Sequence, residues 1–92
     1  MSKITVYTKD FCPFCVQAKT QLQDMNITFN EINIDLDKDA KAFIKDQGFK
    51  TVPQIFHNGE LFVEGGASGL AKLSLVEIKE KLNGFGLSGL SL

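Results

Sequence analysis

Residues 3–25, KITVYTKDFCPFCVQAKTQLQDM, contain the patterns of a strand, a cysteine pair and a helix in immediate succession. Polar and apolar residues alternate from Lys3 to Thr8, and the inward-facing members are β-branched, which favours a half-buried strand. From Pro13 to Met25 apolar residues recur at spacings of three and four, as on one face of a helix. Proline is favoured at a first helical position, so the cysteines stand where this helix begins.

The rest of the chain continues the alternation of strands and helices. Residues 28–34 favour a second strand, and Asp37 is placed to cap a second helix that Gly48 ends. The runs 54–56 and 61–63 are joined through Asn58-Gly59, a strong hairpin signal. A short helical turn near 68–73 and a last helix near 75–82 follow, the latter opened by a Ser74–Glu77 capping box. One helical face is expected to cover the sheet with Ala71, Leu75, Ile78 and Leu82.

The element order β-α-β-α-β-β-α predicts an α/β fold with a mixed four-stranded sheet flanked by helices on both faces. Strands joined through a helix should lie parallel, and the hairpin antiparallel. Residues 1–83 are expected to form one domain. Residues 84–92 carry three glycines and no charge, so we expect a flexible C-terminal tail there.

Composition excludes several classes of protein. The chain has 92 residues and a net charge of -1, and all ten of its basic residues are lysines, so nucleic-acid binding is not expected. The apolar runs are far shorter than a membrane span, and Met1-Ser2-Lys3 does not begin a signal peptide. We therefore expect a cytoplasmic monomer that does not bind a membrane.

Cys12 and Cys15 are the only cysteines. A disulfide closing so short a loop would contribute about 2 kcal/mol, against about 3 for a fifteen-residue loop, which favours chemistry over a structural role. Cys12 precedes the first helical turn, where free N–H groups, the helix dipole and Lys9 should lower its thiol pKa, partly offset by Asp10. Cys15 should be less exposed. The two thiols should therefore be unequal, with Cys12 attacking and Cys15 resolving. The acidity of Cys12 helps it mainly as a leaving group, because a more acidic thiol leaves faster from a mixed disulfide.

Two metal-binding alternatives remain open at this point. Cys12, Cys15 and His57 would supply three zinc ligands, which do not complete a structural site. An iron–sulfur cluster shared between two chains is the other alternative, although Pro13 stiffens the loop between the cysteines. We expect no metal.

Three short motifs carry a family resemblance. Cys12-Pro13-Phe14-Cys15, with Lys9 upstream, is similar to the Cys-Pro-Tyr-Cys active-site motif of the glutaredoxin family, with phenylalanine for tyrosine. Thr51-Val52-Pro53 resembles its Thr-Val-Pro segment, and Gly65-Gly66 resembles its diglycine. The motifs occur in the family's order within residues 4 to about 82. The resemblance implies a thioredoxin-like fold in which the proline is cis and faces the cysteines.

The resemblance also implies glutathione as reductant and ligand. The backbone of Val52 would pair with glutathione, as in strand addition, and lysine or glutamine side chains would bind its glycine carboxylate. Backbone N–H groups after the diglycine would bind its γ-glutamyl carboxylate. Acidic residues are common in the family where this chain has Ser68 and Gly69, so recognition of the ammonium group departs from the pattern. The expected glutathione contacts are Lys9, Phe14, Gln47, Lys50, Val52, Pro53, Gly66, Ala67 and Ser68.

The function implied is that of a dithiol glutaredoxin. It would reduce protein disulfides and glutathione mixed disulfides through Cys12 and Cys15, and ribonucleotide reductase is a client typical of the family. The missing acidic pair motivates an alternative, a glutaredoxin-like redoxin reduced by thioredoxin reductase. The third hypothesis is a dimer that holds an iron–sulfur cluster through Cys12 and glutathione.

Overall fold

The computed structural model describes residues 4–82, in which four strands and four helices follow one another in the order that the sequence predicts. The expected end of the domain at residue 83 and the expected tail, 84–92, lie outside the described residues. Within 4–82, no helix has the length and apolar character that a membrane crossing needs. The elements are β1 (Ile4–Thr8), α1 (Pro13–Asp24), β2 (Phe29–Asn33), α2 (Lys38–Asp46), β3 (Gln54–His57), β4 (Glu60–Val63), α3 (Gly66–Ala71) and α4 (Leu75–Leu82).

The strands form one mixed sheet in the order β2-β1-β3-β4. β1 and β2 are parallel, while β3 is antiparallel to both β1 and β4. The predicted parallel pair and antiparallel hairpin are therefore confirmed, with β1 and β3 at the centre. This is the thioredoxin-like arrangement, and the cysteines follow the end of β1.

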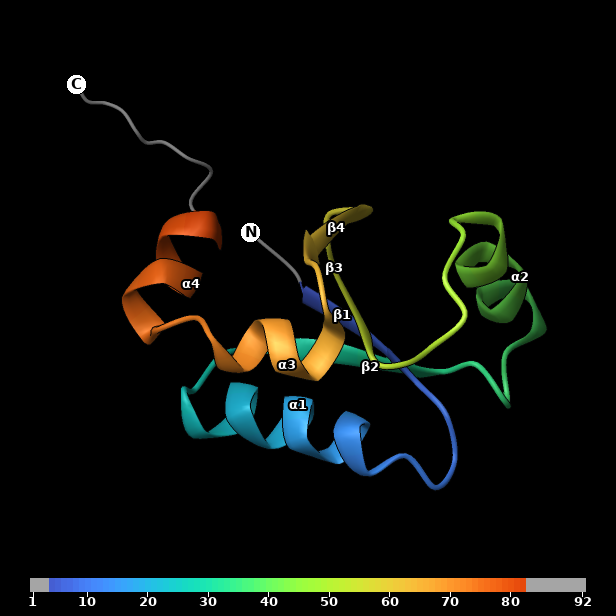
Figure 1. Ribbon diagram of the computed structural model, residues 1–92, viewed down its shortest axis with the longest axis horizontal. Helices are drawn as coiled ribbons and strands as arrows, with labels where there is room; N and C mark the ends of the chain where they lie inside the picture. The colour runs from blue at the N-terminus through green and yellow to red at the C-terminus, as the bar shows by residue number, and fades with distance from the viewer. Residues whose placement is uncertain (1–3, 83–92) are drawn as a thin grey trace.

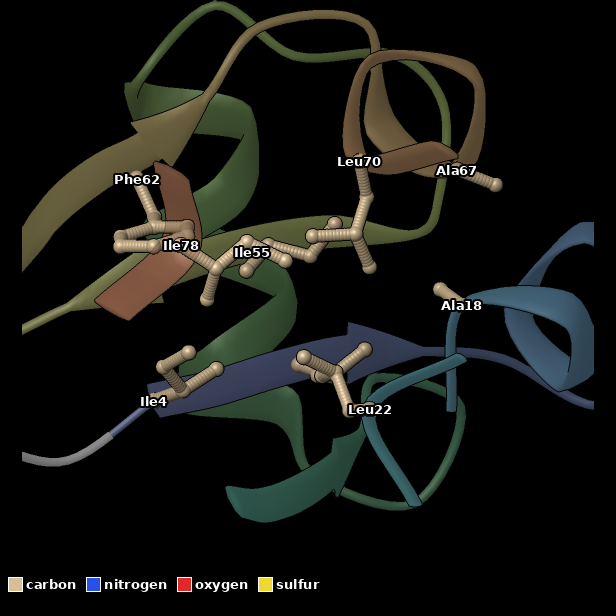
Figure 2. Packing of buried hydrophobic residues seen from close by; sticks show 9 residues of the cluster. Ile4, Ala18, Leu22, Ile55, Phe62, Ala67, Leu70 and Ile78 are labelled. Carbon is tan, nitrogen blue, oxygen red and sulfur yellow. The ribbon is translucent and has the colours of Figure 1, made fainter. Parts of the chain in front are cut away.

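The main hydrophobic core lies on one face of the sheet, under α1, α3 and α4 (Figure 2). Alternating side chains of the central strands point into it. Figure 1 shows α2 apart from the other three helices, with the strands between. The residues of this core are Ile4, Val6, Ala18, Leu22, Ile55, Phe62, Ala67, Leu70 and Ile78.

An aromatic cluster covers the opposite face of the sheet. Tyr7 and Phe56 each follow a residue of the main core along β1 and β3. Phe43 of α2 packs on both, with ring centroids 5.7 and 5.3 Å away. Phe49 adds a fourth ring, 6.0 Å from Phe56. Helices therefore flank both faces, as predicted.

The structure contains the helix caps and the hairpin turn that the sequence predicts. Asp37 Oδ1 accepts a hydrogen bond from the Ala40 N–H at 3.0 Å, and Gly48 follows α2 with a φ of +87°. Asn58 and Gly59 have φ values of +53° and +86°, the left-handed pair that a tight hairpin requires. Both hydrogen bonds of the capping box at the start of α4 are present. The Glu77 N–H donates to Ser74 Oγ at 3.1 Å, and the Ser74 N–H donates to Glu77 Oε1 at 2.8 Å.

The prediction for α3 was wrong in its start and in part of its buried face. The helix begins at Gly66 rather than near residue 68, and Leu70, not Ala71, enters the core. The reason is close packing on the end of β4, because a Cβ at Gly69 would overlap the Glu64 carbonyl. Leu75 is 37% exposed, whereas Ile78 and Leu82 pack on the core as expected.

Candidate active site

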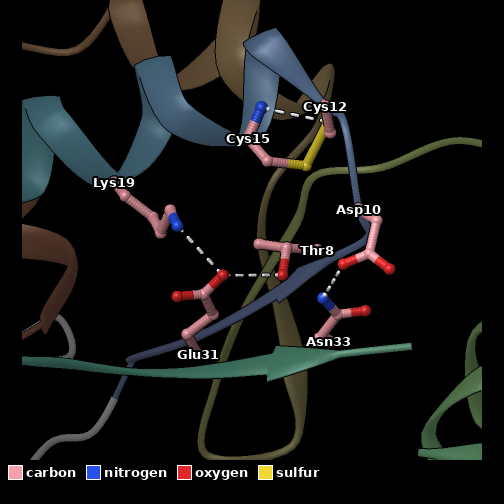
Figure 3. Close-up of polar contacts among 7 residues, drawn as sticks. All are labelled: Thr8, Asp10, Cys12, Cys15, Lys19, Glu31 and Asn33. Carbon is pink, nitrogen blue, oxygen red and sulfur yellow. Dashed lines mark hydrogen bonds and ion pairs between the residues drawn. A yellow bond between two sulfur atoms is a disulfide. The ribbon is translucent and has the colours of Figure 1, made fainter. Parts of the chain in front are cut away.

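Cys12 is the N-cap residue of α1. Its Sγ accepts a hydrogen bond from the Cys15 N–H at 3.1 Å (Figure 3), and its carbonyl accepts from Cys15 and Val16 at 3.1 and 3.2 Å. Pro13 occupies the first turn, where a missing N–H costs no helical bond. The sulfur thus lies at the positive end of the helix dipole, where backbone donors favour an anion.

Cys15 forms a disulfide with Cys12, and their Cα atoms are 5.2 Å apart. Cys15 is 2% exposed, on the inward face of α1, while Cys12 is half-buried. The predicted difference in exposure between the two cysteines is therefore present in the fold.

The segment before β3 faces the cysteine pair. The Val52-Pro53 peptide bond is cis, and the Val52 carbonyl oxygen lies 3.9 Å from Cys12 Sγ. Pro53 is buried and Val52 half-buried. The cis proline that the resemblance implied, and its position beside the cysteines, are confirmed.

A groove of about 610 Å³ runs from Val52-Pro53 to the start of α3. Gly66 has a φ of +57°, and a Cβ there would lie 2.7 Å from the Pro53 carbonyl oxygen, so a glycine is needed for α3 to start against this segment. Six of the predicted contact residues line the groove: Phe14, Val52, Pro53, Gly66, Ala67 and Ser68.

Sequence reasoning missed several residues of this groove, of which Glu64 is the most informative. Glu64 is the one carboxylate among the lining residues, and it precedes the diglycine, whereas the family pattern directed attention to positions after it. Glu64 lies in the turn between β4 and α3. Phe49, Thr51, Gln54, Leu61 and Gly65 also line the groove and were not predicted.

A second groove, of about 380 Å³, contains Lys9 and Lys50 together with Val52. It shares Phe49, Thr51 and Val52 with the first groove. Gln47, the remaining predicted contact, is exposed at the C-cap of α2 and lines neither of these grooves.

A polar network lies beside the cysteines (Figure 3). Glu31 Oε2 accepts from the Thr8 hydroxyl at 2.8 Å and pairs with Lys19 Nζ at 3.0 Å. Burial raises the pKa of Glu31, but the hydrogen bonds from Lys19 and Thr8 and the Lys19 charge together hold it below its ordinary value. Lys19, Glu31 and both cysteines line one pocket. Lys19 is four residues after Cys15 on α1, and the sequence motifs did not predict it as a site residue.

Comparison with known proteins assigns the family, because the model of the family described as Glutaredoxin matches residues 4–62. This chain is a glutaredoxin. The match includes the cysteine motif and Thr51-Val52-Pro53 but ends before Gly65-Gly66. The diglycine of this glutaredoxin is therefore supported by its geometry against Pro53 rather than by the family match.

Individual glutaredoxins show the same likeness. The chain is 40% identical to glutaredoxin 3 of Escherichia coli over 57 residues, which are 61% of this chain and 69% of that protein. It is 36% identical to glutaredoxin-C6 of rice (Oryza sativa) over 61 residues, 62% of this chain but only 54% of the rice protein. The matched part of this glutaredoxin thus spans about half of the rice relative.

Solved structures agree with the fold. Glutaredoxin 1 from Francisella tularensis, complexed with cacodylate, is 33% identical with a TM-score of 0.63 and covers 77% of this chain and 90% of its own. A buckwheat glutaredoxin–glutathione complex has a TM-score of 0.71 over 89% of this chain and 77% of its own. At 22% identity, the buckwheat structure supports the fold alone.

The histidine considered for a zinc site is remote from the cysteines. His57 pairs with Ile4 at the beginning of β1, whereas Cys12 follows the other end of that strand. Among residues 4–82 of this glutaredoxin, no three His, Cys, Asp or Glu side chains are grouped as metal ligands. The fold therefore does not assemble the zinc set of Cys12, Cys15 and His57.

Proposed function

We propose that this glutaredoxin is a dithiol oxidoreductase that takes electrons from glutathione and reduces protein disulfides and glutathione mixed disulfides. The observation that carries the proposal is the Cys12–Cys15 disulfide at the start of α1, with the half-buried Cys12 beside Val52 and the buried Cys15 behind it. A substrate would reach the sulfur of Cys12, whereas the buried sulfur of Cys15 would react only with Cys12.

The reduction of a disulfide then takes two exchange steps. The Cys12 thiolate attacks one substrate sulfur, forms a mixed disulfide and expels the other substrate sulfur as a thiolate. Cys15, after losing its proton, attacks Cys12 and expels the bound substrate thiolate, which leaves Cys12 and Cys15 oxidised. Two glutathione molecules restore the dithiol and become glutathione disulfide. In the first of these restoring exchanges Cys15 departs, and in the second Cys12 departs as an anion favoured by the Cys15 N–H and the helix dipole.

Glutathione would lie across the two grooves, with its sulfur at Cys12. Its backbone would pair with Val52 beside Pro53. Its glycine carboxylate would lie near Lys9 and Lys50, with Gln47 at the margin, and its γ-glutamyl carboxylate would lie near the N–H groups of Ala67 and Ser68 beside Gly66. Phe14 would cover the bound tripeptide. We assign the ammonium group to Glu64, since this carboxylate lines the first groove.

The decisive experiment is turnover of a small glutathione mixed disulfide by glutathione and glutathione reductase. Cys12→Ser should abolish turnover. Cys15→Ser should retain removal of glutathione from the mixed disulfide but lose reduction of protein disulfides, because that reaction needs the second sulfur. Equal inactivity of the two variants on the mixed disulfide would contradict the assigned roles.

A second candidate function rests on Ser68 and Gly69, which bring no carboxylate to the start of α3. A redoxin reduced by thioredoxin reductase would not need to bind the glutathione ammonium. Turnover supported by thioredoxin reductase and not by glutathione would select this function over the first. An iron–sulfur dimer would instead show cluster absorbance and the mass of two chains, whereas we propose a colourless monomer.

The client and compartment belong to the proposal as well. Dithiol chemistry of this kind operates where thiols are kept reduced, so we propose a cytoplasmic protein. Ribonucleotide reductase is a client typical of the family, and the clients proposed here are disulfide-containing or glutathionylated proteins in general.

A further inference from the structure

Four lysines surround the second groove. Lys41 and Lys45 of α2 join Lys9 and Lys50 around it, and Asp35 is its one acidic lining residue. We call these residues, with the apolar lining formed by Ile34, Ile44, Phe49 and Val52, the lysine groove. It gathers four of the ten lysines but one of the eleven acidic residues of a chain whose net charge is -1. The positive charge is therefore a local feature.

None of the four ammonium groups forms an ion pair with a carboxylate of the described residues. Within residues 4–82, the ion pair that the structure contains is Lys19–Glu31, which involves none of these lysines. The Asp35 carboxylate accepts a hydrogen bond from the Asp10 N–H at 3.0 Å instead of pairing with a lysine. The groove thus presents an excess of positive charge over an apolar floor that includes Ile44, which is 2% exposed.

The lysine groove also adjoins the reacting sulfur. It contains Val52, whose carbonyl oxygen is 3.9 Å from Cys12 Sγ. Lys41 and Lys45 are one helical turn apart on α2, about 6 Å along its axis, and an extended chain covers that distance in about two residues. Two side chains of an extended client segment can therefore lie beside Lys41 and Lys45, in a groove that Val52 connects to Cys12.

We propose that the lysine groove binds an acidic segment next to the disulfide cysteine of a client protein. The inference rests on the proposed function, since it names the clients of the same site. Charge complementarity carries it: aspartate or glutamate side chains would meet Lys41 and Lys45, and apolar side chains between them would meet the floor of the groove. The proposed orientation of glutathione puts its glycine end here, so the acidic residues follow the client's cysteine.

The test uses disulfide-linked homodimers of a short peptide with blocked termini. One version carries two glutamates soon after its cysteine, and the matched version carries glutamines. Each homodimer oxidises the reduced full-length protein in a single turnover, in which Cys12 and Cys15 lose two electrons and two peptide thiols form. The wild-type protein should react about 3- to 10-fold faster with the acidic version at low salt, and the preference should shrink at about 0.5 M salt.

Charge-reversal variants locate the effect. Lys41→Glu with Lys45→Glu should remove or invert the preference for the acidic peptide. The control, Lys72→Glu with Lys79→Glu, changes the net charge equally at exposed positions outside the groove and should keep the preference. Equal rates for the two peptides with wild-type protein, or equal losses in both double variants, would overturn the proposal.

The outcome is independent of glutathione turnover. A wild-type protein that prefers the acidic peptide but does not use glutathione would support the lysine groove and reject the proposed reductant. A protein that uses glutathione and shows no peptide preference would support the proposed reductant and reject the lysine groove as a client-binding site.

Discussion

Replacing Gly66 by alanine tests how the start of α3 and the Val52-Pro53 segment depend on each other. Alanine at a φ of +57° costs about 1–2 kcal/mol in backbone conformation, and its Cβ would lie 2.7 Å from the Pro53 carbonyl oxygen. Relieving that overlap should cost about 1–3 kcal/mol more. Gly48→Ala is the matched control, since Gly48 has a φ of +87° and no atom within 4 Å of the added Cβ.

Thermal and urea denaturation of the reduced proteins measure the difference. Gly66→Ala should have a Tm lower than that of Gly48→Ala by at least about 4 °C, because 1 kcal/mol shifts Tm by about 4–8 °C in a domain of this size. Displacement of Pro53 should also raise the KM for a glutathione mixed disulfide in Gly66→Ala. Equal stabilities of the two variants, together with an unchanged KM in Gly66→Ala, would refute the reasoning.

Three further predictions concern charged side chains. Glu64→Gln should raise the KM for a glutathione mixed disulfide about 3- to 10-fold while sparing a substrate that lacks the amino group; steady-state kinetics on both will show a common loss if Glu64 is merely structural. The folded pKa of Glu31 lies below its unfolded value, so its stabilising effect is present above the unfolded pKa and lost as pH falls through the folded one. Glu31→Gln should therefore lower the free energy of unfolding by about 0.2–1 kcal/mol at pH 7 and leave it unchanged in acid. If urea denaturation shows a difference from wild type that persists in acid, the assigned pair with Lys19 is contradicted. Asp37→Ala should lower the unfolding free energy by about 0.5–2 kcal/mol, because the N-cap hydrogen bond of α2 is lost. An unchanged Tm would contradict this stabilising role of the cap.

Local sequence patterns predicted most of the fold. The Asn58-Gly59 turn, the Asp37 cap and the Ser74–Glu77 box each depend on residues a few positions apart, so the sequence contains the whole interaction. The start of α3 depends instead on Gly66 meeting Pro53. Contacts between distant segments are set by tertiary packing, and the spacing of apolar residues after the diglycine did not reveal them.

The candidate site divides in the same way. Cys12, Cys15 and the cis proline were found because they form short motifs. Glu64 was missed because its place in the groove follows from the path of β4 into α3. The lysines of α2 were missed because an exposed charged residue on a helix is the ordinary solvated state, and their gathering around Val52 is visible only once α2 is packed on the sheet.

The disulfide joins the N-cap residue of α1 to a residue in the first turn of the same helix. Making or breaking this bond therefore alters one helical turn, and neither of the grooves that flank Val52 has to change its walls. We expect the oxidised and reduced proteins to present nearly the same shape to a client. Departure of a finished client must then follow from the loss of its covalent attachment, which leaves the protein free to collect the next one without rearranging.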